Sequence, residues 1–198
     1  FDVVAYTGNQ TAGRTVTHNL GAVPEMMWIK SRNGSGSSYN WICYLSALGT
    51  THYAILNETY INPDTSNVHF NGTAPTSTVF SLGTSLAVNR SGYTYVAYLF
   101  ASLAGISKVS SVTHSGTTNV DCGFTSGARF VLLKRTDATG DWYVWDSERG
   151  IVSGNDPYLL LNTTGAEVTN TDYIDPLSSG FTITSSFTAG DYIFYAIA

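Results

Sequence analysis

Apolar residues along the chain gather into short runs separated by polar sequences. The runs are about five to eight residues long, as strands usually are, and no stretch of ten residues has the 3.6-residue apolar period of a helix. The sequences between them are rich in Gly, Asn, Asp and Ser, which supply turns. The pattern predicts strands near residues 3–7, 14–18, 25–32, 40–45, 53–57, 78–82 and 94–101, with equivalents in the second half.

Some of these runs are apolar at every position. Residues 26–29 and 130–133 are the clearest examples, and such runs indicate strands that are covered on both faces. Regular short strands joined by polar turns favour a sandwich over an α/β fold. We therefore predict an all-β protein made of antiparallel, jelly-roll-like β-sandwiches.

The two halves of the sequence repeat each other. The matched blocks are residues 16–21 with 120–125, 25–30 with 129–134, 41–44 with 142–145, 53–59 with 158–164, 75–80 with 176–181, and 95–101 with 192–198. The blocks keep their order while the loops between them change length, as duplicated units do. We predict two homologous β-sandwich units, residues 1–101 and 102–198, joined by a short connection and packed together.

Composition and charge exclude several classes of protein. Thr, Ser, Gly and Asn supply 80 of the 198 residues, and charged residues only 12%. The net charge of −5 argues against a nucleic-acid partner, which needs a basic surface. Residues 1–101 carry four acids and four bases, whereas residues 102–198 carry ten acids and five bases. No apolar run approaches the ~20 residues of a membrane span, so we expect no membrane insertion.

Cysteine, histidine and the first residue give weaker signals. Cys43 lies in an apolar run, which predicts a buried thiol, and a disulfide between Cys43 and Cys122 is left open. His18 and His114 are interpreted as turn residues with free side chains. Because the sequence begins with Phe1 and shows no signal peptide, we expect it to be a piece of a longer protein.

The carboxylates of the second half are the best candidates for catalysis. They are Asp141, Asp146, Glu148, Asp156, Asp172 and Asp175. Asp146 and Glu148 alternate as two acids on one strand face would, and a glycosidase needs such a pair. Arg149 follows directly, and we favour an acid-capped turn. Calcium binding by Asp137 with Asp141, or by Asp172 with Asp175, is a weaker alternative without the DxDxDG motif. We predict no enzyme, no metal and no cofactor.

Aromatic residues give the other lead. Trp41 and Trp142 are equivalent in the repeat, and we assign them to the two cores. A further set of tyrosines lies at loop or alternating positions: Tyr39, Tyr60, Tyr93, Tyr143 and Tyr173. Exposed tyrosine beside Asn, Asp and Thr suits sugar binding, although tyrosine is also common at sandwich edges. The candidate ligand-binding residues are Tyr39, Tyr93, Tyr143 and Asp146.

Several motifs carry a family resemblance. They are residues 6–9 (Tyr-Thr-Gly-Asn), 18–21 (His-Asn-Leu-Gly), 24–27 (Pro-Glu-Met-Met), 119–124, 140–147 and 155–162. Together they resemble an uncharacterised domain family that occurs, often in tandem, in tail-fibre-like and other virion proteins of cyanophages and marine phages. The second copy departs from the first motif at residues 112–115.

The resemblance implies a non-enzymatic virion protein, a phage tail fibre or appendage module for host-surface attachment or virion assembly. Its implied location is the virion, outside the cell, and its implied partners are other virion proteins and a host-surface glycan. The chain could also form a homo-oligomer. Two alternatives remain: a carbohydrate-binding module, or a repeat of a bacterial surface or matrix protein.

Overall fold

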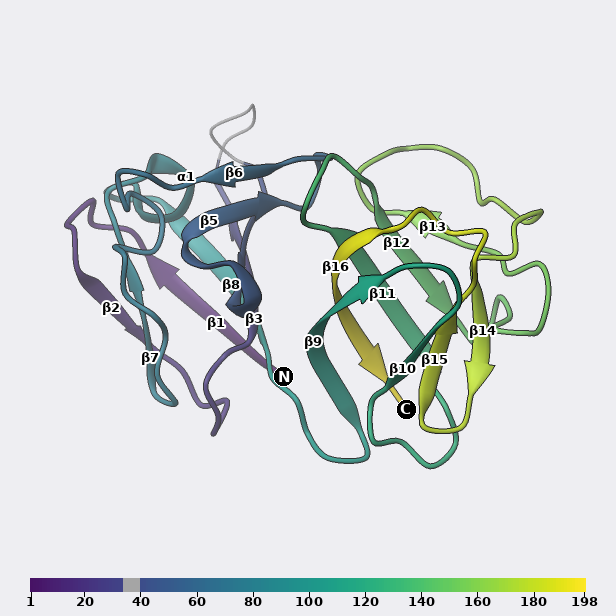
Figure 1. The fold of residues 1–198 in the computed structure, drawn as a ribbon. Coiled ribbons are helices and arrows are strands. Elements are labelled where there is room, and N and C mark those ends of the chain that lie inside the picture. The colour runs from purple at the N-terminus through teal and green to yellow at the C-terminus, as the bar shows by residue number, and fades with distance from the viewer. Residues whose placement is uncertain (34–39) are drawn as a thin grey trace. The chain divides into compact units, whose positions relative to one another are not determined.

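The computed structural model describes residues 1–33 and 40–198, and these fold into two compact units, Phe1–Ala101 and Ser102–Ala198 (Figure 1). Antiparallel strands make up both units, in four sheets that form two sandwich-like halves. The prediction of an all-β sandwich fold is confirmed. The described residues contain no helix with the length and apolar character that a membrane crossing needs.

The first unit contains a six-stranded sheet and a two-stranded sheet. Its elements are β1 (Asp2–Thr7), β2 (Arg14–Thr17), β3 (Met26–Ser31), β4 (Ile42–Leu45), a 3-10 turn (Ser46–Leu48), β5 (Gly49–Ile55), β6 (Ile61–Pro63), β7 (Val79–Leu82), α1 (Leu86–Asn89) and β8 (Thr94–Phe100). The large sheet has the order β1-β8-β3-β4-β5-β6, and β2 pairs with β7. Each of the seven predicted strand regions overlaps an observed strand, although β5 begins four residues before its predicted region, and the three-residue β6 was missed.

The second unit repeats this arrangement. Its strands are β9 (Ser107–His114), β10 (Thr118–Asp121), β11 (Phe130–Arg135), β12 (Trp142–Asp146), β13 (Leu159–Leu160), β14 (Ile174–Leu177), β15 (Gly180–Ile183) and β16 (Gly190–Ile197). The large sheet has the order β13-β12-β11-β16-β9, which read backwards corresponds to β1-β8-β3-β4-β5. The smaller sheet, β10-β15-β14, contains the counterpart of the β2-β7 pair. The matched sequence blocks therefore occupy matching places in the two sheets.

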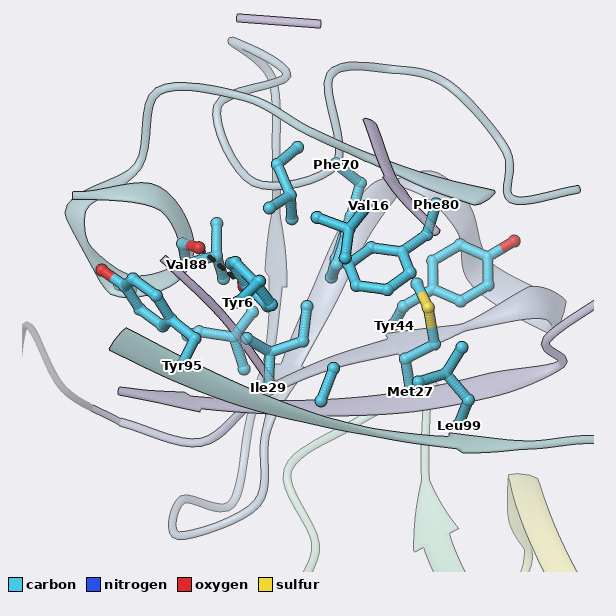
Figure 2. Packing of buried hydrophobic residues seen from close by; sticks show 14 of the residues in the cluster. Tyr6, Val16, Met27, Ile29, Tyr44, Phe70, Phe80, Val88, Tyr95 and Leu99 are labelled. Atoms are coloured by element: carbon cyan, nitrogen blue, oxygen red, sulfur yellow. Dashed lines mark hydrogen bonds between the residues drawn. The ribbon is translucent and has the colours of Figure 1, made fainter. Parts of the chain in front are cut away.

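The core of the first unit lies on one face of its large sheet. Figure 2 shows Met27 and Ile29 of β3 packed in a cluster with Phe80 of β7 and Phe70. The Tyr6 hydroxyl, at the edge of this cluster, donates a hydrogen bond of 2.7 Å to the Val88 carbonyl. Successive side chains of a strand point to opposite faces, yet Met26 and Met27 are only 0% and 1% exposed. The prediction that this run is covered on both faces is confirmed.

A buried amide joins three parts of the first unit. Asn89, at the end of α1, is 0% exposed. Its Nδ2 donates to the carbonyls of Gly83 at 2.7 Å and Thr11 at 3.1 Å, and its Oδ1 accepts the Asn9 N–H at 3.0 Å. These bonds satisfy backbone groups of the loop after β1 and of the turn after β7, so one side chain fixes both.

The prediction that each unit has a tryptophan in its core is confirmed for Trp142 and wrong for Trp41. Trp142 is fully buried and Trp41 only half-buried, but neither belongs to the main core cluster of its unit. The strand period of two explains this, because Tyr44 and Trp145 face those clusters and the neighbouring positions point away. Lys30 lies over the Trp41 ring at 6.0 Å, and Lys134 over the Trp142 ring at 5.6 Å.

The sequence predicted free side chains for His18 and His114, and this prediction is wrong. His114 is buried and bonds to the Phe187 carbonyl at 3.2 Å and to Thr118 Oγ1 at 3.0 Å. His18 is buried too, with its Nε2 3.1 Å from the Thr76 carbonyl. Each ring bonds to a backbone carbonyl far away in the sequence, which local patterns do not reveal. Cys43 and Cys122 are both buried and are not joined to each other, so the disulfide left open above is not formed.

We expect Asn89→Ala to lower the free energy of unfolding by about 1–3 kcal/mol for each buried backbone group that it leaves without a partner. The measurement is urea unfolding followed by circular dichroism. Asn9→Ala is the matched control, because its side chain bonds only to the exposed Thr11 N–H. Equal, small effects of the two substitutions would show that the buried amide does not hold the loops.

Candidate functional site

The residues predicted to bind a ligand do not form one site. Tyr39 lies outside the described residues. Tyr93 belongs to the first unit, where it is half-buried and its ring centroid lies 4.2 Å from the Arg90 guanidinium carbon. Tyr143 and Asp146 both belong to β12, but they are three positions apart and therefore point to opposite faces of the sheet.

Asp146 caps a turn. Its Oδ1 accepts the backbone N–H of Glu148 at 3.1 Å and of Arg149 at 2.9 Å, and its Oδ2 pairs with the Arg149 guanidinium. Arg149 also pairs with Glu167 at 2.9 Å. Because β12 ends at Asp146, Glu148 is not on the strand and the alternation of two acids on one face does not occur. The interpretation of this segment as an acid-capped turn is confirmed.

Asp156 is the most deeply buried acid of the second unit, at 0% exposed. Its Oδ1 accepts the Val152 N–H at 2.8 Å, while its Oδ2 has no hydrogen-bond partner among the described residues. Burial, with a smaller contribution from the negative charges of Asp172 and Asp175, raises the pKa of Asp156 to about 6. Within the described residues, no three His, Cys, Asp or Glu side chains are placed to hold one metal ion.

Three tyrosines of the second unit pack together, and we call them the tyrosine cluster: Tyr143 of β12, Tyr158 directly before β13, and Tyr173 directly before β14. The Tyr158 and Tyr173 rings stack at 5.6 Å and 25°, and Tyr143 lies 5.3 Å from Tyr158 and 6.3 Å from Tyr173. Below them, Tyr143 stacks on the buried Trp145 at 5.5 Å and 12°. Tyr158, at 8% exposed, belongs to the buried core cluster, and Tyr143 and Tyr173 are half-buried against it.

The hydroxyl groups of the cluster have no hydrogen-bond partner among the described residues. The three hydroxyl oxygens are not fully buried, so each keeps access to water. Burial raises the pKa of Tyr143 well above its usual value, and the Asp141 carboxylate raises it further. The pKa of Tyr158 is raised by burial, by Tyr173 and by Asp141. The cluster therefore presents neutral phenols beside one carboxylate.

A side-chain amide fixes Asp141 in this place. Asn162 Oδ1 accepts the Trp142 N–H at 2.8 Å, and its Nδ2 donates to Asp141 Oδ1 at 2.7 Å. We call this arrangement the asparagine latch. It leaves Asp141 Oδ2 without a protein partner among the described residues.

The first unit has the same latch with different neighbours. Asn57 Oδ1 accepts the Trp41 N–H at 3.1 Å, and its Nδ2 donates to Asn40 Oδ1 at 2.9 Å. The counterparts of Tyr143 and Tyr158 are Ile42 and Tyr53. The sequence repeat gives this correspondence, and the pairing of β4 with β5 matches that of β12 with β13.

The ring that stacks on Tyr53 is His69, at 4.0 Å and 31°. Burial lowers the pKa of His69, and the neighbouring Asp64 opposes this. His69 therefore contacts Tyr53 where Tyr173 contacts Tyr158, and Asn40 replaces Asp141, while Tyr60 also raises the pKa of Tyr53.

A small pocket of about 330 Å³ also lies in the second unit, lined in part by Lys108 and Cys122. Burial raises the pKa of the Cys122 thiol to about 11, with a smaller contribution from Asp121. At neutral pH the thiol is protonated and is a poor nucleophile. The residues that line this pocket include none of the carboxylates that the sequence suggested as catalytic candidates.

Sequence reasoning missed Tyr158 and Asn162. Both fall inside a matched block, which we read as framework, and Asn162 begins one of the Asn-X-Thr sequences that the composition makes frequent. The signal that could have found them is the comparison of polar residues inside the matched blocks. Asn57 and Asn162 are retained there, while Asn40 becomes Asp141 and Ile42 becomes Tyr143.

The stability of the protein is expected to depend on the ionisation of Asp156. The pKa of Asp156 is about 6 in the folded state, and its ordinary value is 3.8. The stability that comes from the neutral Asp156 carboxyl is therefore complete below about pH 4 and is lost as pH rises through about 6. Urea unfolding at several pH values should show Asp156→Asn gaining stability relative to the wild type between pH 5 and 7.5. Glu148→Gln, at an exposed position, is the control, and a pH-independent difference for Asp156→Asn would contradict the assignment.

Comparison with known proteins gives one result. No curated protein and no solved structure was found to match the chain. One family model matches, over residues 1–198, so that it spans both units and both latches. The chain therefore belongs to the family described as Domain of unknown function (DUF7483).

Proposed function

We propose that the protein is a non-enzymatic attachment module of a virion appendage, such as a phage tail fibre, and that it binds a host-surface glycan. The resemblance to virion proteins supports the location. A repeated β framework with polar, weakly charged loops supports a role in display, because such loops vary without disturbing the sheets. Other virion proteins are the partners proposed for its assembly.

The observation that carries the binding role is the tyrosine cluster with Asp141. Sugars offer many hydroxyl groups, and phenols and carboxylates are suitable partners for them. Such recognition uses a few polar groups on a largely apolar, rigid surface. The cluster combines these features in the second unit, where rings are held by core packing and the hydroxyl groups are left without protein partners.

The environment of the acids supports binding without turnover. A glycosidase needs two carboxyl groups on either side of the bond that is cleaved. Asp146 is held by its turn and by Arg149, and Asp156 is fully buried. Among the residues described for the tyrosine cluster, Asp141 is not accompanied by a second carboxylate. Of the alternatives, a carbohydrate-binding module shares the glycan ligand, whereas a repeat of a bacterial surface or matrix protein differs in the particle that carries it.

The test is a glycan array followed by a reducing-end assay on every polysaccharide that the protein binds. We expect binding to at least one glycan and no release of reducing ends. Hydrolysis that is abolished by Asp146→Ala or Glu148→Ala would contradict the proposal. Immunogold labelling of intact virions tests the location, and labelling of a bacterial surface alone would favour the bacterial alternative.

A further inference from the structure

We infer that the tyrosine cluster of the second unit is the glycan site and that its ligand is a neutral sugar, while the counterpart in the first unit does not bind it. This inference rests on the proposed function and makes it specific to one place and one class of ligand. It depends on three properties of the cluster: its hydrogen-bonding groups, its rigidity and its charge.

The hydrogen-bonding groups match a sugar with neighbouring hydroxyls. Each of the three phenols can donate one hydrogen bond and accept another, and the carboxylate of Asp141 accepts only. A sugar hydroxyl that donates to Asp141 can accept from a phenol at the same time. Because a hydrogen bond to a charged group is the stronger kind, Asp141 is the group expected to orient the ligand.

The backbone and the core hold these groups in place before any ligand arrives. The Tyr173 carbonyl accepts the Thr184 N–H at 3.0 Å, and Thr184 Oγ1 donates to the Asp172 carbonyl at 2.6 Å, which holds Tyr173 against the residue that follows β15. Tyr158 exchanges two backbone hydrogen bonds with Val168, at 3.0 and 3.1 Å. A site whose side chains are already ordered loses little conformational entropy on binding.

The charge around the cluster disfavours an acidic sugar. Asp141 lies directly before β12, two positions from Tyr143 and therefore on the same side of the strand, and its negative charge raises the pKa of Tyr143 and Tyr158. Residues 102–198 carry ten acids and five bases. A uronic acid or a sulfated sugar would bring a like charge beside Asp141, which is unfavourable. A neutral sugar meets no such repulsion.

The first unit shows what the same framework looks like without this chemistry. Ile42 stands in place of Tyr143, and the ring against Tyr53 is that of His69, so neither of these two neighbours carries a phenol. Asp64, which also lies near Tyr53, is 3% exposed and accepts the backbone N–H groups of Val68 and His69 at 3.0 Å each. Its carboxylate is therefore committed to a loop of the protein, whereas Asp141 Oδ2 is available.

The experiment measures Kd by isothermal titration for neutral hexasaccharides of glucose, mannose and galactose and for uronic-acid hexasaccharides of the same length. The variants are Tyr143→Phe, Tyr158→Phe and Tyr173→Phe, which remove a hydroxyl and keep the ring, and Asp141→Asn, which copies the first unit and keeps an acceptor for Asn162. The matched control is Tyr53→Phe. Circular dichroism melting shows that each variant is folded.

We expect the wild type to bind a neutral hexasaccharide and not its uronic-acid counterpart. Each Tyr→Phe change in the cluster should weaken binding about threefold to tenfold, as the loss of one hydrogen bond does. Asp141→Asn should weaken it more, and Tyr53→Phe should leave it unchanged. These effects should appear with melting temperatures close to that of the wild type.

The possible failures are distinct. If the wild type binds none of the sugars here and none on the array, the proposed function itself is wrong. If it binds a sugar with equal affinity in all cluster variants, or loses binding in Tyr53→Phe, the site is elsewhere and the attachment role stands. Preference for the uronic-acid hexasaccharides would overturn the ligand class.

Discussion

The asparagine latch is the interaction on which both the sheet edge and the candidate site depend. In each unit one amide accepts the N–H of a tryptophan, which directly precedes β4 in the first unit and begins β12 in the second. The same amide donates to the side chain before that tryptophan, Asn40 in the first unit and Asp141 in the second. An asparagine side chain offers an acceptor and a donor in fixed relation, so both bonds form together. The donor requires an acceptor at that position, which both an amide and a carboxylate provide. The latch therefore permits a change of charge at this position without a change of backbone.

The cluster shows how a core can also act as a binding surface. Its rings belong to the packing of the second unit, since Tyr143 stacks on Trp145 and lies 5.1 Å from Phe187. Aromatic pairs of this kind contribute about 0.5–1.5 kcal/mol each beyond the area that they bury. The hydroxyl groups add nothing to this packing within the described residues. Stability is supplied by the rings and recognition by the oxygens, and a tyrosine can therefore carry both roles at one position.

How far the sequence predicts this molecule depends on the range of the interactions involved. Short apolar runs and turn residues are local, and they predict the strands and the repeat. The period of two would also have predicted that Trp41 and Trp142 face away from the clusters that contain Tyr44 and Trp145. The hydrogen bonds of His114 to Phe187 and of Asn89 to Thr11 are not local, since each joins residues more than 70 positions apart. The candidate site needed both kinds of information, because Tyr143, Tyr158 and Tyr173 lie on three segments that only the folded sheets bring together.

The most direct test of the account is an NMR titration of the labelled protein with the neutral hexasaccharide that it binds best. We predict chemical-shift changes at residues 141–145, 158–162 and 171–174, and none in the first unit at residues 40–44, 53–57 and 67–70. Changes confined to the first unit, or equal changes at both sets, would contradict the claim that one framework carries the ligand chemistry in its second unit alone.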